Sequence, residues 1–177
     1  FKDTEKPVIL IIGGSSGSKV INTTLRDLLP ELLKRYNVIH LCGKGNLDPS
    51  LSNTDGYAQF EYANKELADL FALSDLVISR AGANAICELL ALRKPNILIP
   101  LSAAASRGDQ ILNANSFRSS GYSYVLEEEN VSNTALLEAI EHVFKNRDSY
   151  IEAMKKNNGK DSIEAIVELI IEASENK

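Results

Sequence analysis

The stretch that decides the fold is LVISRAGANAICELLAL, residues 76–92. It opens as an apolar strand, passes through small residues around Gly82, and continues as a helix that carries several leucines. Glycine and alanine leave the backbone uncovered at such a turn, so the free N–H groups of the helix start can attract an anion such as phosphate. Glu88 lies in the first turns of the same helix, where a carboxylate is suited to accept the hydroxyl groups of a sugar. The stretch therefore predicts a nucleotide pocket.

Further apolar segments on both sides of this stretch predict strands that alternate with helices. Residues 8–12 are continuously apolar, as in a parallel strand that is buried on both faces. We expect six strands, at residues 8–12, 38–42, 57–62, 76–79, 96–100 and 122–126. This alternation specifies an α/β fold, a Rossmann-like doubly wound parallel sheet with right-handed crossovers, formed by a single domain over residues 1–177.

Periodic apolar positions and capping residues place the helices between and after the strands. We expect helices at residues 19–35, 65–73, 109–119, from Ser132, at about 148–156, and from Asp161, besides the one that opens after Gly82. Pro30 is expected to kink or divide the first of these, and Asn64 to cap the second.

Three loops follow strands one, four and five of this scheme, at residues 13–18, 79–88 and 101–113. Doubly wound sheets bind ligands outside the carboxyl ends of their strands. In a central strand order of 1-4-5, the three loops would converge on one crevice.

The first loop, Gly13-Gly14-Ser15-Ser16-Gly17, matches the dinucleotide fingerprint G-x-G-x-x-G only loosely, because Ser15 stands in place of the second glycine. Strand two does not end in an acidic residue, and no Gly-Lys-Ser/Thr follows the loop, so NAD and P-loop binding are disfavoured. The loop can either present N–H groups and the Ser15 hydroxyl to a phosphate or serve only as a tight turn.

Several other polar residues allow both a functional and a structural interpretation. Arg80 can contact a phosphate or form a structural hydrogen-bond network at the strand end. Gln110 and Asn113 share a helix face and suit sugar hydroxyls. Equally, this segment can be an N-terminal cap of the helix, with Asp109 favourable to the helix dipole. His40 is expected to be structural or at the surface, as is His142.

Composition narrows the class of protein further. The net charge is −5 and the pI about 5.1, so no global nucleic-acid footprint is present. No cluster of Cys, His and Asp has metal-ligand spacing, and two isolated cysteines suggest a reducing compartment.

The chain begins at Phe1 with a polar lead, so we expect a piece of a longer protein, a processed terminus being the alternative.

Taken together, these motifs resemble the C-terminal half of a GT-B glycosyltransferase, in particular the N-acetylglucosaminyltransferases of bacterial peptidoglycan synthesis. The resemblance spans nearly the whole chain. It rests on Gly-Gly-Ser-Ser-Gly-Ser at residues 13–18, Asp-Leu-Val-Ile-Ser-Arg-Ala-Gly-Ala-Asn at 75–84, Glu-Leu-Leu-Ala at 88–91, Pro-Asn-Ile-Leu-Ile-Pro at 95–100, and Asp-Gln-Ile-Leu-Asn-Ala at 109–114.

The resemblance implies a site for UDP-N-acetylglucosamine. We expect no cofactor, no metal and no nucleic acid to be involved. It implies that Glu88 takes the ribose hydroxyls and that the sugar is held by Gln110 and Asp109 with support from Asn113. The remaining implied contacts are Ser15 to the diphosphate, the backbone at Ala63 and Asn64 to the uracil edge, and the backbone at Ala83, Asn84 and Ala85 to the α-phosphate. Many relatives carry His or Gln where this chain has Asp109.

The implied reaction is inverting transfer of N-acetylglucosamine to lipid I, the undecaprenyl-pyrophosphoryl-MurNAc-pentapeptide, which gives lipid II. In that family the acceptor site, the general base and the membrane-facing patch belong to an N-terminal domain, which this sequence lacks. We therefore expect donor binding without turnover from this hexosyltransferase domain. The location implied is cytoplasmic, with the full-length protein peripheral on the cytoplasmic face of the cell membrane.

Three other functions are compatible with the same motifs. One is the donor-binding subunit of a two-chain UDP-N-acetylglucosamine transferase. Another is a UDP-sugar epimerase domain, which would need catalytic carboxylates and histidine from two halves. The last is a non-catalytic α/β interaction module, which would not bind uridine nucleotides.

Overall fold

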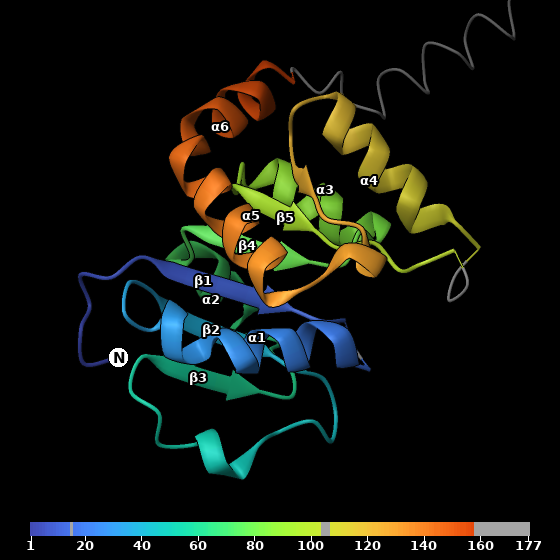
Figure 1. Ribbon diagram of the computed structural model, residues 1–177. Coiled ribbons are helices and arrows are strands. Elements are labelled where there is room, and N and C mark those ends of the chain that lie inside the picture. Colours follow the sequence, from blue (N-terminus) through green and yellow to red (C-terminus); the bar gives the residue numbers. More distant parts are fainter. Residues whose placement is uncertain (15, 104–106, 158–177) are drawn as a thin grey trace, which may run out of the picture.

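The computed structural model describes residues 1–14, 16–103 and 107–157 (Figure 1). Within these residues, six parallel strands form one sheet in the order β3-β2-β1-β4-β5-β6. The expected central order 1-4-5 is therefore confirmed. The strands are β1 (Val8–Ile12), β2 (Asn37–Leu41), β3 (Tyr57–Phe60), β4 (Leu76–Ser79), β5 (Asn96–Leu98) and β6 (Tyr124–Val125).

Helices cover both faces of the sheet, as the doubly wound prediction requires (Figure 1). One face carries α1 (Lys19–Leu32) and α5 (Asn133–Lys145), and α6 (Arg147–Lys156) follows α5. The other face carries α2 (Leu67–Leu73), α3 (Ala83–Ala91) and α4 (Asp109–Ser119). Short 3-10 turns occur at η1 (Pro49–Leu51) and η2 (Glu128–Asn130).

The continuous apolar strands supply both cores at once, because successive side chains point to opposite faces. Ile9 and Ile11 of β1 pack in the core under α1 and α5, whereas Val8 and Leu10 pack in the core under α2, α3 and α4. Ile9, Leu10 and Ile11 are fully buried. This two-sided burial explains why the strands do not alternate between apolar and polar residues.

Several expected boundaries differ from the structure. Helix α1 ends at Leu32 instead of Arg35, and it is not divided at Pro30, which is exposed near the end of the helix. The helix expected at residues 65–73 begins at Leu67, and its N-cap is Glu66, so the prediction that Asn64 caps it is wrong. Residues 64–67 instead form a turn, in which the Leu67 N–H donates to the Asn64 carbonyl over 3.3 Å. The helix predicted from Asp161 lies outside the described residues.

Three strands are shorter than the sequence pattern suggests: β3 ends at Phe60, β5 ends at Leu98 instead of Pro100, and β6 has two residues. Cys42 is buried directly after β2 and Cys87 is exposed on α3, and both are free thiols. In the described part of the chain, no helix is long and apolar enough to cross a membrane.

Candidate nucleotide-binding site

A cavity of about 710 Å³ lies at the carboxyl ends of β1, β4 and β5. All three loops that were expected to converge contribute to its wall, so that part of the prediction is confirmed. The lining residues are Ile12, Gly13, Gly14, Ser16, Gly17, Ser79, Arg80, Gly82, Ala83, Asn84, Ala85, Leu101 and Gln110.

Helix α3 points its amino end into this cavity. Its N-cap is Gly82, which has no side chain to cap the helix, so the N–H groups of the first turn are not occupied by a cap. Ala83, Asn84 and Ala85 form that first turn and line the cavity. Oriented N–H groups at a helix start carry partial positive charge, so this wall is suited to an anion.

The glycine loop after β1 is held against the end of β2. Gly17 has a φ of +75°, and a Cβ added there would lie 2.1 Å from the carbonyl oxygen of Cys42. Gly43 has a φ of +85°, and a Cβ there would lie 2.2 Å from the Gly17 nitrogen. The two backbones can approach only because both residues are glycine. Gly43 was not recognised from the sequence, and Ser15 lies outside the described residues.

A buried polar network supports the same carbonyl group of Cys42. The Asn22 amide donates to it over 2.9 Å, and the Asn22 Oδ1 lies 2.9 Å from Nε2 of His40. His40 Nδ1 is in turn 2.9 Å from the Tyr57 hydroxyl. Burial, with a smaller effect of the Arg26 charge, lowers the pKa of His40 to about 3. His40 is therefore a neutral structural residue, which agrees with one of the two roles expected for it.

The third loop places Gln110 in the cavity wall. The Leu101 N–H donates to Gln110 Oε1 over 3.1 Å, which engages the oxygen of the Gln110 amide and not its NH₂ group. Asn113 does not line the cavity, but its amide donates to the Ala81 carbonyl over 3.0 Å. Asp109 is exposed in the first turn of α4 and is not among the lining residues.

Glu88 lies outside the lined cavity. It is exposed on α3, three residues after Ala85 and four after Asn84, so the three share one helix face. The carboxylate can thus reach a ligand group that extends from the cavity along α3.

A smaller hollow of about 190 Å³ adjoins the main cavity and shares Ile12 and Gly14 with it. Ala63 and Asn64, which the resemblance assigned to a base, line this hollow, and so does the exposed Tyr62. The structure thus places Ala63 and Asn64 beside the main cavity, whereas Glu88 lies on α3 outside the residues that line it.

Arg80 belongs to a structural network, which was one of the two roles considered for it. One terminal nitrogen, Nη1, donates to the carbonyl oxygens of Ile99 (3.1 Å) and Pro100 (3.3 Å). The other, Nη2, donates to the hydroxyl of Ser18 over 2.7 Å. The guanidinium therefore joins the end of β5 to the start of α1.

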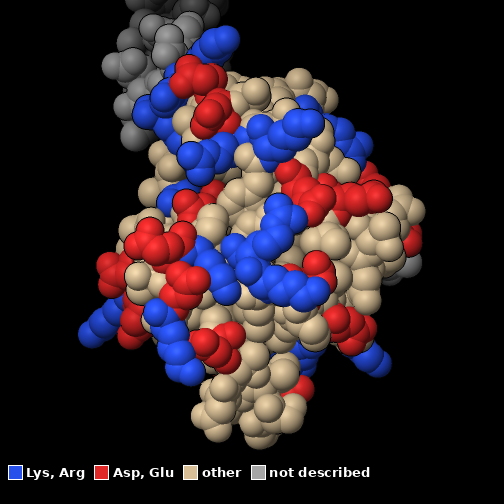
Figure 2. All heavy atoms as spheres, turned by 60° about the vertical axis from the view of Figure 1, so that its left-hand side comes forward, with Lys and Arg blue, Asp and Glu red and all other residues tan. Residues whose placement is uncertain are grey.

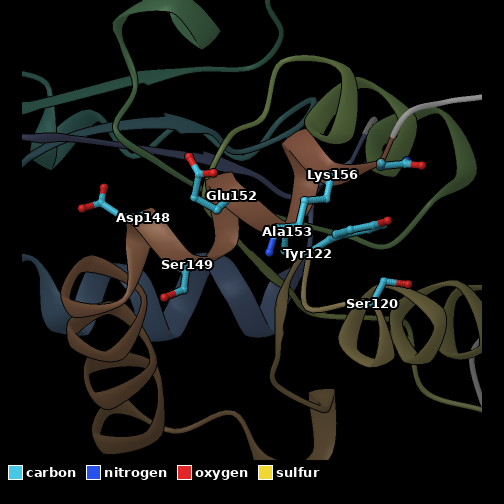
Figure 3. A pocket seen from close by; sticks show the side chains of 8 residues that line it. Ser120, Tyr122, Asp148, Ser149, Glu152, Ala153 and Lys156 are labelled. Carbon is cyan, nitrogen blue, oxygen red and sulfur yellow. The ribbon is translucent and has the colours of Figure 1, made fainter.

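A second hollow of about 690 Å³ lies away from this site, between the end of α4 and α6 (Figure 3). It is lined by mixed polar and charged side chains, among them Tyr122, Asp148, Glu152 and Lys156. Figure 3 shows these side chains around an open surface, and none of the residues predicted to bind a ligand is among them.

Charged side chains of both signs occupy the face shown in Figure 2, where a central group of Lys and Arg is bordered by Asp and Glu. That face is therefore not uniformly basic. Among the described residues, no group of three His, Cys, Asp or Glu side chains could hold a metal ion.

A family model, the glycosyltransferase family 28 C-terminal domain, matches residues 8–170 of the chain. The chain belongs to this family. Among the relatives of this family 28 domain, one from Lachnoclostridium phytofermentans is 65% identical over 166 residues, which is 94% of the chain and 47% of the relative. One from Clostridium novyi is 58% identical over 170 residues, 96% of the chain and 48% of the relative.

Both relatives are named UDP-N-acetylglucosamine–N-acetylmuramyl-(pentapeptide) pyrophosphoryl-undecaprenol N-acetylglucosamine transferase. The chain spans about half the length of these curated relatives. In structure, the family 28 domain is similar to MurG of Acinetobacter baumannii, with a TM-score of 0.75 and 24% identity over 97% of the chain and 51% of that protein. It is also similar to the kitacinnamycin glycosyltransferase, with a TM-score of 0.72 and 17% identity over 85% of the chain and 38% of that protein. These likenesses establish the fold.

Proposed function

We propose that this family 28 domain binds UDP-N-acetylglucosamine as the donor half of an N-acetylglucosaminyltransferase. The whole enzyme would transfer the sugar to the lipid-linked MurNAc-pentapeptide acceptor, lipid I, in peptidoglycan synthesis. The observation that carries the proposal is the convergence of three loops on one cavity into which an uncapped helix start points. The names of two relatives, which are 58% and 65% identical to the chain over the matched residues, support this choice of donor and acceptor.

The diphosphate of the donor is assigned to the wall formed by the start of α3 and the glycine loop. Ala83, Asn84 and Ala85 offer N–H groups without competition from a capping side chain. The glycines of the first loop allow a ligand to approach the backbone closely. Ser15 would add a hydroxyl from that loop. Together these groups supply hydrogen bonds and partial positive charge to an anion without a metal ion.

The uridine is assigned to the side of the cavity where the smaller hollow adjoins it. The uracil edge would meet the backbone at Ala63 and Asn64. Glu88, on the same face of α3 as Asn84, would accept hydrogen bonds from the ribose hydroxyls. A carboxylate that accepts two such bonds is a strong determinant for a nucleoside over an inorganic anion.

The sugar is assigned to the start of α4. Gln110 is oriented by the Leu101 N–H, so its NH₂ group can donate to a sugar hydroxyl or to the acetamido carbonyl. Asp109 would accept from sugar hydroxyls, because its charge disfavours a position beside the diphosphate. Asn113 would support the site by holding Ala81.

The transfer step itself needs groups that this chain does not supply. The acceptor site and the general base are assigned to an N-terminal domain of the whole enzyme, which would work as a peripheral protein at the cytoplasmic face of the membrane. The chain alone is therefore expected to bind donor and not to transfer sugar. Robust transfer by the chain alone would contradict this division of labour.

Calorimetric titration of the chain with UDP-N-acetylglucosamine, UDP-glucose and ADP-ribose tests the proposal. We expect the affinity to fall in that order, because the first ligand alone satisfies both the uridine and the acetamido contacts. Equal affinity for all three ligands would contradict a specific donor site. Absence of uridine-nucleotide binding at millimolar concentration would favour a non-catalytic interaction module.

A further inference from the structure

A carboxylate outside all three loops of the site is joined to two of them. Glu128 lies in η2, after β6, and its Oε1 accepts a hydrogen bond from Nη2 of Arg80. Its other oxygen, Oε2, accepts from the Ser102 N–H over 3.1 Å. Glu128 does not line the cavity. It therefore acts on the site only through the residues it holds.

Arg80 extends this connection to the start of α1. Besides Glu128, its terminal nitrogens contact the end of β5 and the Ser18 hydroxyl. Ser18 directly follows the glycine loop and caps α1, because its Oγ accepts from the Ile21 N–H over 3.3 Å. One ion pair thus links the connection after β6 to the glycine loop.

Ser102 extends the connection to the sugar side of the cavity. Its neighbour Leu101 lines the cavity and donates to Gln110, while Ser102 itself donates to Glu128. The consecutive N–H groups of Leu101 and Ser102 are therefore held by two different side chains. Loss of the Glu128 contact would let the backbone at Leu101 and Ser102 move. Gln110 would then no longer be held in one orientation.

The ion pair is shielded from solvent, since the Arg80 side chain is 11% exposed and that of Glu128 is 14% exposed. Removing one partner of such a pair leaves an uncompensated charge, which is much more costly than losing a surface pair. Here the charge left behind would be on Arg80, which lines the cavity. Solvent and ligand would then compete with Ser18 and the end of β5 for the hydrogen-bond donors of Arg80.

We propose that Glu128 is a positioning residue of the donor site, which sets the glycine loop and the Leu101–Ser102 backbone for the diphosphate and the sugar. This inference rests on the proposed donor binding. It predicts that loss of the carboxylate lowers the affinity for ligands that carry a diphosphate. The affinity for uridine should not change, because the uridine contacts lie on α3 and beside β3. Glu128→Gln keeps the size of the side chain but removes its charge and replaces one of the two accepting oxygens by an NH₂ donor, so one of the contacts to Arg80 and Ser102 is lost.

The experiment titrates the chain and its variants with UDP-N-acetylglucosamine and with uridine, followed by NMR. Glu128→Gln is expected to weaken UDP-N-acetylglucosamine binding by about tenfold or more, and uridine binding by less than about twofold. Glu128→Asp, which keeps the charge but is too short to reach both partners, is expected to give a smaller loss of the same kind.

The matched control is Glu127→Gln, because the neighbouring carboxylate pairs with Arg118 over 2.5 Å at the surface and does not contact the cavity residues. This variant is expected to bind both ligands as the unaltered chain does. Uridine binding also shows whether a variant is folded, because an unfolded chain would not bind uridine.

Four outcomes would overturn the positioning role of Glu128. These are unchanged or tighter binding of UDP-N-acetylglucosamine by Glu128→Gln, an equal loss for both ligands, failure of both Glu128 variants to fold, and a loss in Glu127→Gln that matches that in Glu128→Gln. Absence of UDP-N-acetylglucosamine binding by the unaltered chain would instead contradict the proposed function, so the two failures are distinct.

Discussion

The side-chain amide of Asn113 donates a hydrogen bond to the main-chain carbonyl of Ala81, 3.0 Å away, and so ties α4 to the turn that begins α3. Ala81 is fully buried. Its carbonyl oxygen has little chance of finding water if this bond is lost. The contact joins two of the loops that form the cavity, although neither residue lines it.

Asn113→Ala is expected to lower the free energy of unfolding by about 1–3 kcal/mol, because it leaves a buried acceptor unsatisfied. It should also weaken UDP-N-acetylglucosamine binding, since the turn before α3 loses its hydrogen bond to α4. Urea unfolding and calorimetry measure the two effects. Asn115→Ala, at an exposed position of the same helix, is the control. Equal behaviour of the two variants would contradict a role for the Asn113–Ala81 bond.

Glu88→Ala is expected to weaken nucleotide binding at least about tenfold, because each charge-assisted hydrogen bond to a ribose hydroxyl contributes roughly 1.5–3 kcal/mol. Stability should change little, since Glu88 is exposed. Calorimetric titration with UDP and with 2′,3′-dideoxy-UDP measures the effect, and the variant should no longer distinguish the two ligands.

The control for this experiment is Glu138→Ala, which removes an exposed carboxylate in the middle of α5, away from the cavity. If Glu88→Ala bound UDP as tightly as Glu138→Ala does, the ribose role of Glu88 would be wrong.

Gly17→Ala is expected to destabilise the chain far more than Gly45→Ala does. Both residues have a positive φ, 75° and 72°, so both substitutions strain the backbone by about 1 kcal/mol. Only at Gly17 would the new Cβ also collide with the Cys42 carbonyl, at 2.1 Å, whereas nothing lies within 4 Å of a Cβ at Gly45. Urea unfolding of the two variants isolates the collision. Equal losses of stability would show that the glycine loop is not held against β2.

Stability is expected to fall as the pH drops, because His40 is neutral in the folded chain down to a pKa of about 3. The unfolded chain takes up this proton near pH 6.5, so the stabilising contribution is full above that pH and is lost as the pH falls toward 3. Between pH 7.5 and 5.5 the free energy of unfolding falls by about 1.4 kcal/mol. This pH range lies above the one in which carboxylates titrate.

The measurement is urea unfolding at several pH values in a His142→Gln background, which leaves His40 as the only imidazole, since the sequence has 2 histidines. A free energy of unfolding that stays constant between pH 7.5 and 5.5 would contradict a buried neutral His40.

The sequence predicts the sheet well because its central strands are buried on both faces and therefore read as unbroken apolar segments. Val8–Ile12 and Leu76–Ser79 have the predicted bounds for this reason. The partly buried edge strands β3 and β6 are shorter than predicted, and β5 ends at Leu98 although Ile99 and Pro100 are also buried. The start of α2 shifts to Leu67 because a turn at Asn64 precedes it.

The cavity itself could be predicted because each of its loops directly follows a recognisable strand. Supporting residues could not be predicted, because their roles arise only when distant segments meet. Gly43 shows its importance only beside Gly17, and Glu128 only beside Arg80, 48 residues away. Nothing in the local sequence of either residue signals such a neighbour.

Six of the thirteen described residues that line the cavity are glycine or alanine, which has a consequence for inhibition. A compound that bound the main chain at these six positions would meet no side chain larger than a methyl group there, so escape at these positions would require adding atoms. At Gly17 the fold itself forbids an added methyl group. Gly82 also lines the cavity, but it has an ordinary φ of −68° and open space where a Cβ would stand. Resistance to such a compound would therefore arise at Gly82 before it arose in the first loop.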